Sequence, residues 1–209
     1  MSMSRYEVVI TMILLFTLWM ALAPSPWVAV SEKVAKSVVG VDSDTDGKKS
    51  YCTGFVVDSE KDLVVTAGHC EGKVMRVDGS PAAVLWSDER KDLLVLVVKD
   101  LDKPALALAK QGPETGDEVA SVGFGYGLNQ PIFRQHYVSA TGLVIEIPGY
   151  GGPFYGFDSA FAGGNSGSPV VNSAGEVVSV AQSSSPLMGL GVTTDVLKEK
   201  VGKYFATRP

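Results

Sequence analysis

The apolar positions near the start of the chain form one continuous run instead of alternating with polar ones. After a short polar beginning, residues 8–23 are apolar on all sides, and Pro24-Ser25-Pro26 follows. A run without a polar face predicts a hydrophobic helix in an N-terminal targeting segment. The run is long for the core of a signal peptide and slightly short for a membrane span, and it becomes long enough when 27–30 are added.

Two interpretations of this segment remain open. Two places have the small residues that a signal peptidase needs before its cut, one ending at Ala23 and one at Ser31. Pro24 would block a cut after Ala23. We favour the interpretation that residues 1–31 form a cleaved signal peptide. The alternative is an uncleaved anchor that associates with a membrane through residues 8–30. Both place the body of the protein outside the cytoplasm, as a secreted, periplasmic or anchored protein.

From residue 32 onward the chain consists of short β-branched runs separated by turn residues. A Gly- and Pro-containing loop at 111–116 divides these runs into two groups. The pattern predicts an all-β fold of two barrels, about 37–110 and about 117–194, followed by a C-terminal helix at about 195–205 whose apolar spacing is helical. The expected strands are 37–41, 51–57, 63–66, 73–77, 82–86, 93–98, 106–109, 118–123, 135–147, 168–171, 177–183 and 189–193.

Charge and cysteine content narrow the function. The 209 residues carry a formal net charge of −5 without a cluster of Lys and Arg, which argues against nucleic acid as a partner. Cys52 and Cys70 are the only cysteines, and in an exported chain a pair predicts one disulfide. A zinc site would need more ligands and a paired C-x-x-C spacing, so we expect neither a metal nor a cofactor.

One acidic segment, residues 42–47, resembles the opening of a calcium-binding loop. The twelfth position, which should be a glutamate, is Thr53. We therefore interpret 42–47 as a solvated turn.

Two segments predict nucleophilic catalysis. Ser166 is surrounded by small residues in Gly163-Gly164-Asn165-Ser166-Gly167, where backbone N–H groups are unshielded, and those of Gly164 and Ser166 could stabilise an oxyanion. A serine hydroxyl needs a base with a pKa near neutrality, which histidine supplies. His69, in a small-residue turn beside Cys70, is our candidate.

A carboxylate must hold the other ring nitrogen of that histidine. Asp92 opens the apolar run 93–98 and is the candidate, whereas Asp88 and Glu89 lie in a charged turn that we expect to be solvated. The other histidine, His136, has no companion motif. We predict that it is a surface or half-buried strand residue.

The segments Thr66-Ala67-Gly68-His69-Cys70, 92–96 and 163–169 resemble the His, Asp and Ser motifs of the trypsin-like serine proteases, in that family's order. The resemblance covers about 37–204. It implies two packed six-stranded antiparallel barrels with the catalytic triad His69, Asp92 and Ser166 in the cleft between them, and an acyl-enzyme mechanism on a protein or peptide substrate. Asn165 and Ser168 depart from the digestive members, and zymogen activation through an aspartate at position 165 is not expected.

The resemblance also suggests where specificity is set. It places Ala160 at the base of the pocket for the residue before the scissile bond, with Ser183 and Gly191 on its walls. Because the base carries no aspartate, we expect a small or medium apolar residue there and not Arg or Lys. Two alternatives remain: a catalytically silent binding protein that keeps the fold, and a membrane-tethered protein whose N-terminal helix assembles with partners.

Overall fold

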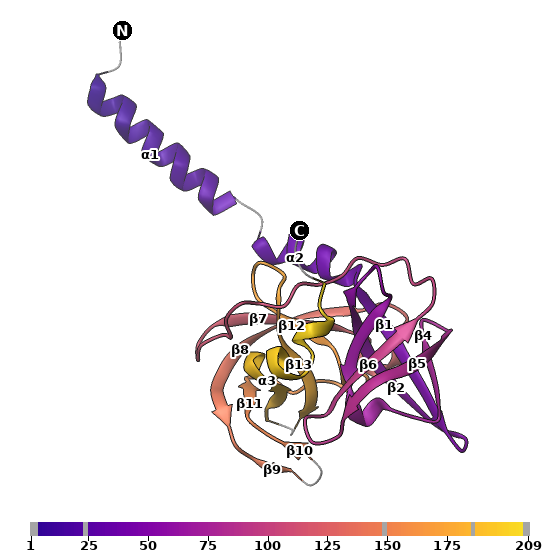
Figure 1. The fold of residues 1–209 in the computed structure, drawn as a ribbon. Helices are drawn as coiled ribbons and strands as arrows, with labels where there is room; N and C mark the ends of the chain where they lie inside the picture. The colour runs from indigo at the N-terminus through magenta and orange to yellow at the C-terminus, as the bar shows by residue number, and fades with distance from the viewer. Residues whose placement is uncertain (1–3, 23–24, 148–149, 185–186, 207–209) are drawn as a thin grey trace.

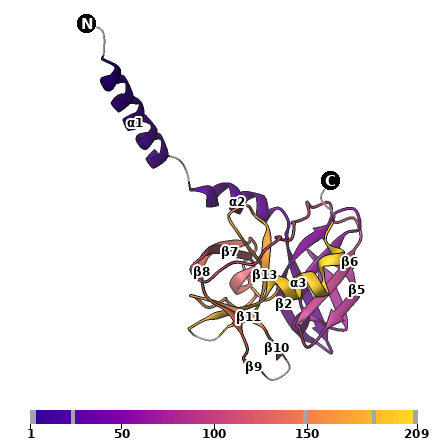
Figure 2. The same ribbon diagram turned by 60° about the vertical axis from the view of Figure 1, so that its left-hand side comes forward.

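Two closed six-stranded barrels lie side by side (Figures 1 and 2). The computed structural model describes residues 4–22, 25–147, 150–184 and 187–206. All neighbouring strands in both barrels are antiparallel, as the sequence predicts.

The first barrel has the strand order β1-β2-β3-β6-β5-β4. Its two central strands, β3 and β6, are apolar almost throughout because they are covered on both faces. The bounds are β1 (Val38–Thr45), β2 (Lys48–Asp58), β3 (Leu63–Ala67), β4 (Val74–Val77), β5 (Ser80–Asp88) and β6 (Leu93–Val98), with the short 3₁₀ turn η1 (Gly68–Cys70) after β3.

The second barrel has the order β11-β14-β13-β12-β7-β8, and a small hairpin of β9 and β10 extends from it. Its strand β11 was not predicted from the sequence. The bounds are β7 (Glu118–Gly123), β8 (Ile132–Leu143), β9 (Glu146–Ile147), β10 (Tyr150–Gly151), β11 (Phe154–Phe157), β12 (Pro169–Val171), β13 (Val177–Ser184) and β14 (Gly189–Val192), with a 3₁₀ turn η2 (Gly125–Gly127) after β7.

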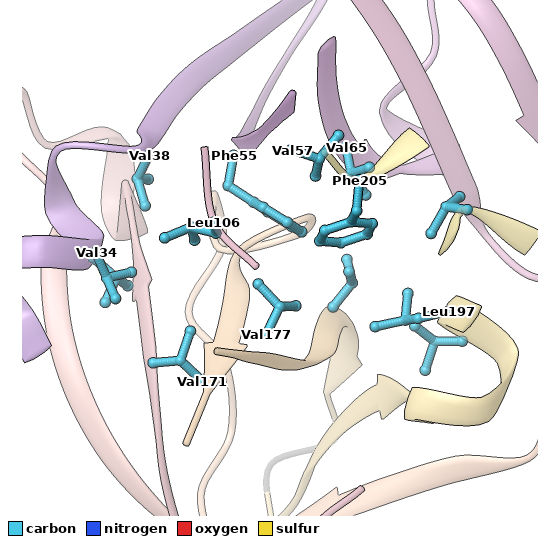
Figure 3. Close-up of a cluster of buried hydrophobic side chains, with 14 of the residues drawn as sticks. Val34, Val38, Phe55, Val57, Val65, Leu106, Val171, Val177, Leu197 and Phe205 are labelled. Atoms are coloured by element: carbon cyan, nitrogen blue, oxygen red, sulfur yellow. The ribbon is translucent and has the colours of Figure 1, made fainter. Parts of the chain in front are cut away.

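A shared hydrophobic core joins the two barrels. It includes Phe55 and Val65 of the first barrel, Val177 of the second, and Leu197 from α3 (Thr194–Lys200), as Figure 3 shows. The predicted C-terminal helix ends earlier than expected, at Lys200, and a 3₁₀ turn η3 (Gly202–Tyr204) follows, because glycine at 202 favours the end of a helix. Burial of this core fixes the positions of loops that come from different barrels.

Two local predictions were wrong. Residues 42–45 continue β1 and pair with residues 48–51, so only Asp46-Gly47 forms the turn. Asp44 pairs with Lys49 on the neighbouring strand, so an acidic residue lies opposite a basic one there. The expected strand at 106–109 is a single bridge between Leu108 and Val177.

The N-terminal segment contains two helices of different character. The side chains described in α1 (Arg5–Leu22) are exposed, and among the described residues no helix combines the length and hydropathy needed to span a bilayer. In α2 (Pro26–Ala35), Trp27, Val30 and Val34 are buried in the shared core, and the Trp27 indole donates to Glu118 Oε2 over 3.1 Å. A cut after Ser31 would remove Trp27 and Val30 from the core. The domain boundary at residue 31 stays a prediction.

Candidate active site

The His69 ring is held by the Asp92 carboxylate. Nδ1 of His69 lies 3.0 Å from Oδ1 and 2.9 Å from Oδ2 of Asp92, and the backbone N–H of His69 donates to Oδ1 over 2.7 Å. The carboxylate is buried, with 2% of its side chain exposed, whereas the imidazole is 32% exposed. A carboxylate at Nδ1 favours the ring proton there, so that Nε2 is the nitrogen that can act as a base.

Local backbone geometry brings these two residues together. His69 lies in η1, directly after the buried strand β3, and Asp92 lies directly before β6, which pairs with β3. Asp92 has a left-handed backbone (φ 52°), which Asp tolerates better than most residues. The absent side chain of Gly68 makes room, because a Cβ there would lie 3.0 Å from the Leu93 nitrogen and 3.1 Å from the Asp92 backbone.

A disulfide anchors the turn that carries His69. Cys52 on β2 and Cys70 in η1 are bonded, as predicted, with 6.2 Å between their Cα atoms. The Cys52, His69 and Cys70 side chains lie close enough to suggest a metal site. Because both sulfurs are consumed by the disulfide, they are not thiolates and cannot hold zinc as ligands there.

The turn that carries Ser166 packs against the first barrel. The Thr53 N–H on β2 donates to the Ser166 carbonyl over 2.8 Å. Gly167 has φ +84°, and a Cβ at this position would lie 2.1 Å from the Thr53 carbonyl oxygen and 2.2 Å from Thr66 Oγ1. Only glycine permits this approach.

Gln182 on β13 connects Asp92 and Ser166. Its side-chain Nε2 donates to the backbone carbonyls of Lys91 and Asp92, the second over 3.1 Å. The backbone carbonyl of Gln182 accepts a hydrogen bond from the Ser166 hydroxyl over 3.4 Å. No local motif singles out Gln182, since it lies 90 residues along the chain from Asp92. The segments that carry His69, Asp92 and Ser166 therefore meet where the two barrels join.

Ala160, Ser183 and Gly191, the pocket residues predicted from the resemblance, lie in surroundings that differ from one another. Ala160 is half-buried, and its carbonyl accepts from the Arg134 guanidinium over 3.3 Å. A Cβ on Gly191 would point into the second barrel, 2.3 Å from Ser179 Oγ. A Cβ on Gly189 would instead lie 2.8 Å from the Ser159 carbonyl oxygen. On β14 it is therefore Gly189, and not Gly191, that lies beside the segment 159–161. Ser183 lies on β13 opposite Leu190.

His136 lies on a strand, β8, as predicted, but the expected surface or half-buried position was wrong, because the residue is only 1% exposed. On β8 the residues that face the barrel interior are His136 and Val138, two apart as strand geometry requires. Its Nε2 lies 2.8 Å from Ser121 Oγ, its Nδ1 lies 2.7 Å from Ser159 Oγ, and Asp158 is 4.0 Å away. This is a second Ser-His-Asp grouping. Because Ser121 is 2% exposed, no peptide can reach its hydroxyl, and we assign the grouping a structural role.

Burial makes His136 a pH-dependent element of stability. Desolvation, with the positive charge of Arg134 adding to it, lowers the pKa of His136 to about 4 from 6.5. The unfolded chain therefore binds one more proton than the folded chain between about pH 6.5 and 4, so stability falls as pH falls through this window. Between pH 6.5 and 5 we expect His136 to account for a loss of about 2 kcal/mol.

Urea unfolding at these two pH values measures this loss, with His136→Gln as the comparison. The variant should be less stable at pH 6.5 but should lose about 2 kcal/mol less on acidification. Equal losses in both proteins would show that His136 is not the group that titrates.

The chain is similar to known serine proteases. A family model described as a trypsin-like peptidase domain matches residues 52–180. A probable periplasmic serine endoprotease, DegP-like, of Hahella chejuensis is 34% identical over 139 residues, which cover 63% of this chain and 29% of that protein. The pro-apoptotic serine protease nma111 of Aspergillus clavatus is 29% identical over 192 residues, covering 77% of this chain and 18% of that protein. The chain thus spans less than a third of the length of these two relatives.

Solved structures have the same fold. The active form of the Rv3671c protease from M. tuberculosis aligns with a TM-score of 0.77 and 25% identity, covering 90% of each chain. The HtrA-type protease AlgW with a tripeptide aligns with a TM-score of 0.76 and 23% identity, covering 86% of this chain and 63% of that one. At that identity the second likeness bears on the fold alone.

Proposed function

Because the chain belongs to the family of trypsin-like peptidase domains, we propose that it is a serine endopeptidase with Ser166 as nucleophile, His69 as general base and Asp92 as the residue that orients His69. The His69–Asp92 contact carries this proposal. It orients a partly exposed imidazole through Nδ1, near the barrel junction against which the Ser166 turn packs. The serine endoproteases among the relatives support the same reaction class.

The reaction proceeds through an acyl-enzyme. The Ser166 oxygen bonds to the scissile carbonyl carbon while its proton passes to His69 Nε2, and the resulting oxyanion accepts hydrogen bonds from the N–H groups of Gly164 and Ser166. His69 then gives the proton to the departing amine as the C–N bond breaks. In the second half, water gives a proton to His69 Nε2 as its oxygen bonds to the ester carbon. As the ester C–O bond breaks, His69 passes that proton to Ser166 Oγ and the acid leaves. No cofactor takes part.

The substrate is a protein or peptide cleaved after a small or medium apolar residue. Ala160 supports this preference, since its methyl group offers no negative charge to a Lys or Arg side chain. The periplasmic relatives support a site of action outside the cytoplasm, and the N-terminal segment is the signal peptide or anchor that this location requires.

Covalent labelling with a fluorophosphonate tests the proposal. The folded, oxidised protein should take up one adduct, and fragmentation of the labelled peptide should locate it on Ser166, because only an activated serine attacks the phosphorus. Protein unfolded in urea is the control and should stay unlabelled. A folded, oxidised protein that takes up no adduct would favour the catalytically silent binding protein, and an adduct on another serine would refute the assignment of Ser166.

A further inference from the structure

Thr53 on β2 uses every polar group it has at the junction of the barrels. Its side chain, which is buried, donates to the Gly164 carbonyl over 2.8 Å and accepts from the Phe124 N–H over 2.9 Å. Its N–H donates to the Ser166 carbonyl over 2.8 Å, and its carbonyl accepts from Thr66 Oγ1 over 2.7 Å. The hydroxyl thus links the serine turn, residues 163–168, to the start of the segment 124–128 through two hydrogen bonds.

That segment sets the direction of the Gly164 N–H. The Tyr126 N–H donates to the Gly163 carbonyl over 2.7 Å. In a trans peptide the C=O and the following N–H point in opposite directions, so the Gly164 N–H faces away from Tyr126. In the next peptide the Gly164 carbonyl points to Thr53 and the Asn165 N–H donates to the Ala162 carbonyl over 3.0 Å.

The peptide between Gly163 and Gly164 needs such contacts because two glycines flank it. Without Cβ atoms, the angles on either side can change together and rotate the peptide at low steric cost. Gly164 has φ +93°, and a Cβ there would lie 2.5 Å from the Phe124 carbonyl oxygen, so a bulkier residue cannot stiffen the turn. Hydrogen bonds from outside the turn must therefore hold it.

Other polar side chains of the serine turn do not supply this support. Among the described residues, Asn165 Oδ1 and Ser168 Oγ are buried without a hydrogen-bond partner. Both lie near Gly123, within 2.9 Å and 1.9 Å of the position that a Cβ on Gly123 would occupy. Thr53 Oγ1 lies 2.9 Å from the same position and has both of its partners.

We propose that Thr53 is a positioning residue that keeps the Gly164 N–H aimed at the oxyanion. The inference rests on the proposed function. Thr53 does not touch the substrate; it acts through the Gly164 carbonyl on one side and through Phe124 and Tyr126 on the other. Its loss should affect the transition state, in which the oxyanion forms, and leave ground-state binding of the peptide nearly unchanged.

Replacement of Thr53 by valine and by serine tests this role. Valine keeps the shape of the side chain without its hydroxyl, and serine keeps the hydroxyl. For Thr53→Val we expect kcat per active site to fall about 10- to 100-fold, with KM changed less than about twofold, because one misaligned donor costs up to about 10² to 10³ in rate. Thr53→Ser should recover kcat to within about threefold. Exhaustive fluorophosphonate labelling counts the active sites.

Thr194→Val is the matched control. The Thr194 hydroxyl is also buried, donates to the Val178 carbonyl over 2.6 Å and accepts from Tyr155 over 3.2 Å, but it lies on α3. This variant should lower the melting temperature and leave kcat per labelled site unchanged.

The outcomes separate this inference from the proposed function. A wild-type protein without labelling or hydrolysis would refute the proposed function. An active wild type with full kcat in Thr53→Val, or an equal loss of kcat in Thr194→Val, would refute only the positioning role.

Discussion

Replacing Ser166 by alanine is expected to lower kcat for peptide hydrolysis by about 10⁶-fold, because the residual rate then comes from substrate binding and the oxyanion donors alone. The melting temperature should stay within a few degrees of that of the wild type. Within the part of the chain that the structure describes, the Ser166 hydroxyl makes one long hydrogen bond, 3.4 Å, to the Gln182 backbone carbonyl, so its removal takes little from the folded state. Steady-state hydrolysis of a peptide substrate and thermal unfolding measure the two quantities.

Ser121→Ala is the control, since Ser121 is the serine whose hydroxyl lies 2.8 Å from His136. This variant should keep kcat within a few-fold of the wild type. It should be less stable, because the buried His136 ring loses a partner. If Ser121→Ala abolished hydrolysis in a folded protein and Ser166→Ala did not, the catalytic grouping would be the one in the second barrel.

Replacing Asp92 by asparagine is expected to lower kcat by about 10⁴-fold. In the wild type, the Asp92 carboxylate accepts hydrogen bonds from His69 Nδ1 and from the His69 backbone N–H. An amide has one oxygen for these two donors, and an NH₂ group that faces Nδ1 favours a ring proton on Nε2 instead. His69 would then be unable to take the Ser166 proton.

Initial rates with the same peptide measure this loss, and Glu89→Gln provides the control. Glu89 is exposed in the turn before Asp92, so removal of its charge should change kcat less than twofold. If Asp92→Asn retained most of the activity, the carboxylate would not orient the base, even though it lies within hydrogen-bonding distance of the ring.

Much of the fold could be predicted because its signals are local. Short β-branched runs and a Gly- and Pro-containing loop indicated two barrels, and both are present. Strand β11 was missed because Phe154–Phe157 is short, contains Gly156 and follows Gly151-Gly152-Pro153, which indicates a loop. Its partners β8 and β14 supply hydrogen bonds that no local pattern reveals.

The burial of His136 depends on how the strands assemble into a barrel more than on its residue type. His136 was expected near the surface because histidine is polar and no motif surrounds it. Once β8 pairs with β7 and β11, its position in the strand turns the ring into the barrel, beside Phe157 and Phe161. Hydrogen bonds to Ser121 and Ser159 make that burial tolerable.

The sequence by itself determined most of the strands, the disulfide and the His69 and Asp92 pair, because motifs of a few residues with special turns specify them. Tertiary structure decided which residues support the Ser166 turn. Thr53 meets Gly164 across 111 positions of the chain, and Gln182 meets Asp92 across 90. Hydrogen bonds depend on distance in space, and those distances are set only when the shared core brings the two barrels together.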